Sequence, residues 1–465
     1  METTENVLSF FTANHSQHDP QWRMTGANVS VVCVACLVEL LESNDVFHLR
    51  KRKVLREVVF LMSSSRHLRE LLTQNARVTS HLCSIITDLL SCENELLMST
   101  AIEALDVITV QLRSENLVAE IVEKLTTQIL LLNNLKKSYP FVLALGRLLK
   151  SIPALSFVIV KDSPNLVEYF LSNILFPEDK IKAAFLFALV QICSNEDALN
   201  VLSFQMKEKI CIQTCAVVAS CIAKDVQMNA LGVIKRFSAD PDVLHSILKP
   251  SSTGTCPMLE SLKRLILSPN EGVQIGAIQC VTQILKNDTA ENPFTKAFLT
   301  SGIGEMLLED LESSNDIVLG SVFCSLDYMV RTQIFYSEGY SVYGIESIIV
   351  GISKAIKLKN PDIIRQSLRV LSLILMMQPS SVQLFPSEKL CKLCANVLYE
   401  SLKSADHRIL TQAACAVEQF LSTDHFPPSM EFETITPLVS TVISHLQKFT
   451  KPRMHFRNAS KGEAR

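Results

Sequence analysis

Glycine, proline and aromatic residues are all scarce in this chain. Its 465 residues include 13 glycines, 17 prolines and a single tryptophan, and aromatic side chains make up only 6%. Glycine and proline are the residues that interrupt helices and form tight turns. Their scarcity argues against a turn-rich chain and favours stacked helices, in which interior helices are apolar around most of their circumference.

A long hydrophobic run is also lacking. The longest apolar stretch, Val29 to Leu41, includes Ser30 and Glu39, whereas a membrane-spanning helix needs about 20 predominantly apolar residues. The stretch therefore predicts a buried helix and no membrane association. The amino terminus has no basic segment leading into an apolar core, so we expect no secretory signal. We expect an intracellular protein whose 14 cysteines stay reduced.

Neither sign of charge is in clear excess. With 44 basic and 47 acidic residues, the net charge is −3, which gives no global attraction to nucleic acid or to anionic membranes. A local basic patch lies in HLRKRKVLREV, at Arg50, Lys51, Arg52, Lys53 and Arg56. It fits a nuclear-import signal or a phosphate-contacting helix, or simply the solvated face of a helix. The patch slightly favours the nucleus over the cytoplasm.

Motifs for catalysis are missing as well. The sequence has no G-x-x-x-x-G-K-[ST] phosphate loop, no G-x-S-x-G, no H-E-x-x-H and no calcium-loop pattern. Its histidines are scattered, and none belongs to a repeated acid/base pairing. We therefore expect no catalytic residues, no cofactor and no enzyme activity.

Two C-x-x-C pairs, Cys33–Cys36 and Cys391–Cys394, are the motifs nearest to a metal site. A structural zinc site needs four converging ligands, usually from two pairs that lie close together, and these pairs lie near opposite ends of the chain. Both fall within helical apolar patterns, in which residues i and i+3 share a face. We therefore expect buried thiols that pack like small hydrophobic side chains, and no metal.

A repeat of about 45 residues is the most informative feature that is present. Similar segments open with a polar turn that holds an acidic residue, followed by a small residue and then by apolar residues at helical spacing. The acidic markers are 44 to 46 residues apart: Asp179, Asp225, Glu271, Asp316, Asp362 and Asp406. Glu95 opens a similar segment 84 residues before Asp179, which leaves room for two units, and Asp45 begins a first unit.

Each part of the repeat has a physical reason. Ser, Asp or Asn before a helix accepts hydrogen bonds from its first N–H groups, and an acid there complements the helix dipole. Small residues such as Gly276, Ala277, Ala413 and Ala414 allow a neighbouring helix to approach. Each period accommodates two or three helices with short connections.

These segments, from roughly Ser91 to Leu421, resemble the armadillo/HEAT superfamily. The resemblance implies an all-α, right-handed superhelical solenoid of about eight or nine units, and an irregular helical bundle is the alternative. We expect a polar N-terminal segment over residues 1–27, the solenoid over 28–447 and a basic, disordered tail over 448–465. Because the pattern stops without a polar capping helix, we expect either a truncated isoform or a last unit capped by a partner.

The solenoid predicts a non-catalytic scaffold that binds other proteins through its concave groove or its loops. Tyr336, Tyr340 and Tyr343 lie in the segment Ile334 to Ile345, which we interpret as a surface loop. Tyrosine recurs at interfaces, so these residues are the candidate partner-binding loop, although the rings could equally cover the base of that loop. Direct nucleic-acid binding through the basic patches is a second hypothesis.

Two comparisons with families narrow the scaffold prediction. Nuclear-import adaptors line their groove with repeated Trp and Asn pairs, whereas the single tryptophan here, Trp22, lies outside the repeats. In its cysteine-rich run of helices the chain is similar to the meiosis inhibitor proteins, an armadillo-type family of germ cells. That resemblance implies a nuclear role in forming meiotic DNA double-strand breaks and in the pairing and synapsis of homologous chromosomes. A general armadillo adaptor of the cytoplasm or nucleus is the alternative.

Overall fold

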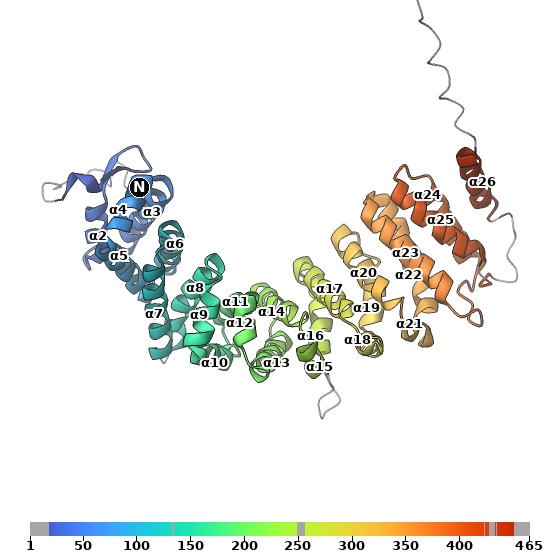
Figure 1. The fold of residues 1–465 in the computed structure, drawn as a ribbon, viewed down its shortest axis with the longest axis horizontal. Helices are drawn as coiled ribbons and strands as arrows, with labels where there is room; N and C mark the ends of the chain where they lie inside the picture. Colours follow the sequence, from blue (N-terminus) through green and yellow to red (C-terminus); the bar gives the residue numbers. More distant parts are fainter. Residues whose placement is uncertain are drawn as a thin grey trace, which may run out of the picture. The chain divides into compact units, whose positions relative to one another are not determined.

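The computed structural model describes residues 18–132, 134–248, 256–422, 424–426, 433 and 435–450. The chain forms two compact units, Met1–Phe237 (unit 1) and Ser238–Arg465 (unit 2). In each unit, helices follow one another side by side in chain order (Figure 1). The described part of unit 1 contains η2 Pro20–Trp22, β1 Arg23–Thr25, β2 Val31–Cys33, α2 Val34–Glu42, α3 His48–Ser64, α4 Arg66–Gln74, α5 Ala76–Asp88, η3 Leu89–Ser91, α6 Glu95–Leu112, α7 Glu115–Leu131, α8 Leu135–Ser151, α9 Leu155–Asp162, α10 Pro164–Asn173, α11 Asp179–Ser194, α12 Glu196–Val201, α13 Phe204–Ser220 and α14 Lys224–Phe237.

The regular elements that the structure describes in unit 2 are all helices. It contains α15 Pro241–Ile247, α16 Pro257–Ile266, α17 Glu271–Lys286, α18 Pro293–Thr300, α19 Ile303–Asp310, α20 Asp316–Met329, α21 Gln333–Ser337, α22 Tyr340–Leu358, α23 Pro361–Met377, α24 Glu388–Leu402, α25 His407–Ser422 and α26 Thr436–Thr450. The helical architecture expected from the repeat is therefore present in both units.

One layer of each unit consists of helices that pack on their counterparts in the neighbouring repeats, and we call these the ladder helices. In unit 1 they are α3, α6, α8, α11 and α14, and in unit 2 they are α17, α20, α23 and α25. A second layer covers one side of the ladder, and in unit 2 it includes α16, α19, α22, α24 and α26. This arrangement of two layers of repeated helices is what a solenoid requires, since each repeat buries the apolar side of the next.

The acidic markers of the sequence repeat lie at the amino-terminal ends of ladder helices. Asp179, Glu271 and Asp316 are the first residues of α11, α17 and α20. The expected caps are present just before them in unit 2, because the side chain of Asn270 accepts a hydrogen bond from the Val273 N–H, and that of Asn315 from the Val318 N–H. The segment from Glu95 to Asp179 contains two ladder helices, α6 and α8, in agreement with the two repeat units predicted there.

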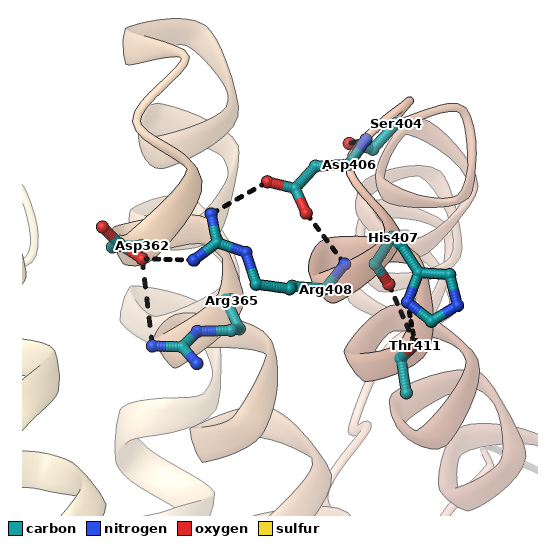
Figure 2. Close-up of polar contacts among 7 residues, drawn as sticks. All are labelled: Asp362, Arg365, Ser404, Asp406, His407, Arg408 and Thr411. Atoms are coloured by element: carbon teal, nitrogen blue, oxygen red, sulfur yellow. Dashed lines mark hydrogen bonds and ion pairs between the residues drawn. The ribbon is translucent and has the colours of Figure 1, made fainter.

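The markers also connect successive repeats. In unit 2, Asn315 donates to Glu271 Oε2 at 3.2 Å, and Asn360 donates to Asp316 Oδ2 at 3.5 Å. The next link joins α23 to α25, where Arg408 Nη1 lies 3.6 Å from Asp362 Oδ1 (Figure 2). Exposed contacts of this kind contribute little individually. They show that the repeated acids serve the stacking of the ladder, and the acids alone therefore do not mark a binding site.

Small residues lie where neighbouring ladder helices approach most closely. A Cβ atom on Gly146 of α8 would lie 2.7 Å from Cδ1 of Phe187 in α11, and one on Gly320 of α20 would lie 3.3 Å from Cγ1 of Ile363 in α23. The predicted packing positions Ala277 and Ala413 are fully buried, whereas Ala414 is exposed. The expectation that small residues permit close approach is therefore confirmed for Ala277 and Ala413, whereas Gly276 is only half-buried.

The amino-terminal end of the described chain departs from the helical pattern. Strands β1 and β2 form an antiparallel hairpin in which Arg23 pairs with Cys33 and Thr25 with Val31. The prediction of one buried helix from Val29 to Leu41 is thus wrong at its start, because Val31–Cys33 is a strand and α2 begins at Val34. The expected boundary between residues 27 and 28 falls in the turn of this hairpin. Most of the expected tail, from residue 451, lies outside the described residues.

Candidate functional site

A polar hollow of unit 1 lies on the ladder helices. It has a volume of about 670 Å³ and is bordered by four successive ladder helices, α6, α8, α11 and α14. Its lining residues are Asp106, Tyr139, Leu143, Arg147, Lys150, Ser151, Lys180, Ala183, Ala184, Phe187, Asp225 and Asn229. Because the hollow crosses several repeats in succession, it is shaped to follow an extended chain. We call it the unit 1 groove.

The unit 1 groove carries three cations and two anions. Lys180 pairs with Glu95 at 2.9 Å, and the hydrogen bond from this lysine to the carboxylate raises its pKa. Arg147 and Lys150 form no ion pair with any residue that the structure describes. Asp106 Oδ1 is buried and has no hydrogen-bond partner within the described part of the chain. The groove therefore holds polar groups that the packing of the ladder does not use.

Other groups in the unit 1 groove have structural roles. Asn229 of α14 donates through Nδ2 to the carbonyl of Ala183 at 2.9 Å, which links two ladder helices across the floor. The Phe187 ring packs against Gly146, where α8 and α11 lie closest together. Burial raises the pKa of Tyr139, so this side chain stays a neutral hydroxyl near neutral pH. Arg147 and Lys150 remain available for a ligand.

Unit 2 has a comparable hollow of about 450 Å³ on α17, α20 and α23, which we call the unit 2 groove. Its lining combines amides and hydroxyls with three charged and several apolar residues: Gln279, Thr282, Gln283, Lys286, Asp316, Ile317, Gly320, Ser321, Cys324, Asn360, Asp362, Ile363 and Gln366. Thr282 contacts Ser325 at 2.7 Å, and the Cys324 thiol donates to Gln366 Oε1 at 3.1 Å. Side-chain amides can both donate and accept, which suits hydrogen bonding to a peptide backbone.

The three tyrosines predicted as a binding loop are not in a loop. Gln333–Ser337 forms α21, Gly339 makes a left-handed turn at φ 73°, and α22 starts at Tyr340. Tyr336 is 5% exposed and donates to the carbonyl of Val330 at 2.6 Å, and Tyr340 donates to that of Leu299 at 2.8 Å. The prediction of a surface loop is therefore wrong, because two of the rings pack back on the solenoid. Only Tyr343, 83% exposed, has the accessibility of a recognition residue.

The predicted basic patch is divided between buried and exposed positions of α3. Lys51 is buried and donates to the carbonyl of Leu41 at 2.7 Å, at the carboxyl end of α2. Burial lowers the pKa of this lysine. Arg50 and Arg52 are half-buried, and only Lys53 and Arg56 are exposed. Lys51 thus belongs to the packing between α2 and α3, and the surface available for a phosphate is smaller than the sequence cluster indicated.

Among the described residues, a single group has side chains placed to hold a metal ion: His18, Cys33 and Cys36. The expectation of buried thiols holds for Cys33, whereas Cys36 is half-buried, and His18 is not among the residues that the sequence singled out. The C-x-x-C spacing was the available signal. The third ligand comes from the other side of the β1–β2 hairpin, which the sequence had not predicted.

No helix within the described residues combines the length and the apolar character that crossing a bilayer requires.

Comparison with solved structures shows the fold. A crystal structure of importin beta matches 90% of this chain and 50% of its own, with a TM-score of 0.55 and 13% sequence identity. At that identity the similarity concerns the fold alone. Together with the repeated ladder, it confirms the predicted all-α, armadillo/HEAT-like solenoid.

Comparison with known sequences shows the family. Meiosis inhibitor protein 1 of Homo sapiens is 26% identical over 96% of this chain, and that of Mus musculus is 26% identical over 98%. The alignments span 36% and 37% of those proteins, so the chain corresponds to little more than a third of their length. The family model described as the Meiosis inhibitor protein 1 N-terminal domain matches residues 32–465. The chain therefore belongs to the Meiosis inhibitor protein 1 N-terminal domain family.

Proposed function

We propose that this chain is a non-catalytic scaffold whose ladder helices hold extended segments of partner proteins. The observation that carries the proposal is that each unit has a polar groove spanning at least three successive ladder helices. Extended binding surfaces of this kind are how solenoids engage their partners. Peptides bound in an extended form are held through their backbone, and pockets along the groove select their side chains.

The two grooves favour segments of different chemistry. Arg147 and Lys150 give the unit 1 groove two cations without an intramolecular ion pair in the described chain, beside the anions Asp106 and Asp225. It therefore suits a segment whose acidic side chains meet these two cations. Gln279, Gln283 and Gln366 give the unit 2 groove neutral donors and acceptors, so it suits the backbone of a less charged segment.

The process in which the scaffold acts is proposed from its family. The human and mouse relatives are named for meiosis, and the resemblance seen in the sequence implies a nuclear role in double-strand break formation and chromosome synapsis. We assign the chain to the assembly of that machinery, without any cleavage of DNA by the chain itself. The whole relatives are almost three times as long as the aligned part.

Groove binding is tested by selecting displayed random peptides on the full chain. Selected peptides should contain acidic residues, and the double variant R147E/K150E should weaken their binding by tenfold or more, since two attractive contacts become repulsive. The matched control is R77E, which reverses an exposed charge on α5 outside the groove. Equal affinity for the charge-reversed chain and the control would contradict the proposed site.

The meiotic role is tested separately, in germ cells whose own copy is replaced by R147E/K150E at equal protein level. The proposal expects fewer foci of double-strand break markers in early meiosis than with R77E. Equal numbers of foci for the two variants would remove the meiotic role of the groove while leaving peptide binding intact.

Nucleic-acid binding through α3 is the second function considered. The structure leaves Lys53 and Arg56 exposed but engages Lys51 in packing. A salt titration of DNA binding decides this question, because phosphate contacts lose affinity steeply as salt rises. If the chain is a protein scaffold only, the wild type should show no salt-sensitive DNA binding that is lost in K53E/R56E.

A further inference from the structure

The start of α2 holds three potential metal ligands in close proximity. Cys33 is the last residue of β2, Cys36 lies in the first turn of α2, and His18 precedes η2. The two thiols share one side of the helix start because they are three positions apart. His18 Nδ1 lies 3.6 Å from Cys33 Sγ and 3.3 Å from Cys36 Sγ, and all three ligand atoms lie within 4.8 Å of one another.

These separations match the edges of a zinc tetrahedron. With Zn–S bonds of about 2.3 Å and Zn–N bonds of about 2.0 Å, neighbouring ligand atoms lie roughly 3.5–3.8 Å apart. A hydrogen bond between thiol and imidazole gives a similar distance for one sulfur. A neutral imidazole nitrogen has a single lone pair with which to accept, so it serves one thiol, and the two thiols also hydrogen-bond each other. Both sulfurs nevertheless lie within 3.6 Å of Nδ1. The convergence of both thiols on Nδ1 is the arrangement that a cation between them requires.

Glu39 orients the histidine for this role. Its Oε1 lies 2.9 Å from His18 Nε2, and it sits one turn beyond Cys36 on the same helix. A carboxylate at this nitrogen fixes the proton on Nε2 and leaves the Nδ1 lone pair facing the sulfurs. Histidines that bind metals usually have such a partner on their second nitrogen.

A bound ion would stabilise the β1–β2 hairpin. Strands β1 and β2 are three residues each, and an isolated hairpin of this size is marginally stable. Its inner side chains, Met24 and Val32, are 6% and 3% exposed, so the hairpin covers apolar surface at this end of unit 1. An ion held by His18, Cys33 and Cys36 would tie the segment before β1 to the junction of β2 and α2.

We propose that His18, Cys33 and Cys36 bind one zinc ion, which fastens the β1–β2 hairpin to α2. Two sulfurs and one imidazole nitrogen suit zinc among the common divalent ions. Unlike most structural zinc sites, which have four protein ligands, this site has three, and water takes the fourth position. The site is independent of the grooves, so its test does not depend on peptide binding.

The test uses Co²⁺, whose absorption reports its ligands, on the full chain in a reductant that does not bind metal. We expect one Co²⁺ per chain, with sulfur-to-cobalt charge-transfer bands and the visible bands of a tetrahedral ion, and displacement by Zn²⁺. Variants C36S and H18A should lose these bands. Controls C415A, which removes an exposed thiol, and C391S, from the second C-x-x-C pair, should retain them.

Two further measurements separate ligation from folding. Variant E39Q should bind one ion with about 10- to 100-fold lower affinity. Zinc should slow hydrogen exchange of the hairpin amides, such as that of Gly26, which donates to the Ser30 carbonyl, in the wild type but not in H18A. Since His18 lies outside the helices, H18A should keep the wild-type circular dichroism. Absence of charge-transfer bands in the wild type, their persistence in C36S, or a Cys33–Cys36 disulfide in place of the ion would overturn the proposal.

Discussion

The two units present grooves of the same construction but of different chemistry. The unit 1 groove carries three cations, Arg147, Lys150 and Lys180, whereas the unit 2 groove has a single cation, Lys286, among amides, hydroxyls and two carboxylates. The buried sides of the same helices are alike, since Phe185 of α11 and Phe323 of α20 are both fully buried. The repeat thus constrains the side of each ladder helix that packs, and the solvent side is free to vary. Partner choice should therefore reside in the differences between the grooves.

The largest expected effect tests whether the buried sides of the ladder helices are packed alike in the two units. Phe185→Ala and Phe323→Ala should each destabilise the fold by about 3–5 kcal/mol, because each removes a buried ring and leaves a cavity. Urea unfolding of the full chain, followed by circular dichroism, measures both. A loss below about 1 kcal/mol in one unit only would show that the two ladders are not packed alike.

A smaller effect distinguishes the helix contacts of the two units. Gly146→Ala should destabilise by about 1 kcal/mol, since a Cβ atom 2.7 Å from the rigid Phe187 ring costs more than the gain in helix propensity. Gly320→Ala should be neutral or slightly stabilising, because Ile363 lies at 3.3 Å and its side chain can adjust. Shifts in unfolding temperature measure the difference, and the reverse order would contradict the packing described.

The smallest effect concerns pH and unit 2. Burial raises the pKa of Asp310 to about 6, above the value near 3.9 expected in the unfolded chain. Between these values the folded state binds more protons, so stability falls as pH rises from about 4 to about 6. Asp310→Asn should abolish this fall and raise stability at pH 7 by at most about 1 kcal/mol, since the carboxyl group is partly exposed and screened by solvent.

Urea midpoints measured from pH 4 to pH 7 check this prediction, with E346Q at an exposed residue of α22 as control. Asp310 Oδ1 also accepts a hydrogen bond from Gln274 at 3.0 Å, and the amide oxygen of asparagine preserves that contact. A pH profile of Asp310→Asn that parallels the wild type would contradict the assignment.

The sequence predicted the ladder because one physical pattern recurs in it. Markers such as Glu271 and Asp316 lie at helix starts, where capping and the helix dipole favour them. The tyrosine segment was misread because its residues resemble a turn. A single left-handed glycine, Gly339, completes that turn and allows α21 and α22 to form on either side.

Sites that depend on the meeting of distant residues could not be predicted in this way. The groove residues Arg147 and Asp225 lie on α8 and α14, and they share one surface only because α11 packs between those helices. His18 meets Cys33 through the register of the hairpin. In both cases the residue types are visible in the sequence, but their proximity is a result of tertiary packing.

Photo-crosslinking from within a groove tests the central claim most directly. A photoreactive amino acid at Ala183, on the floor of the unit 1 groove, should crosslink the acidic peptides selected on the chain. The same amino acid at Arg77 on α5 should not. Mass spectrometry that places the crosslinks at Ala183, and their loss in R147E/K150E, is the predicted result. Equal crosslinking from Arg77, or crosslinks at Ala183 unaffected by the charge reversal, would contradict a scaffold that binds through its ladder helices.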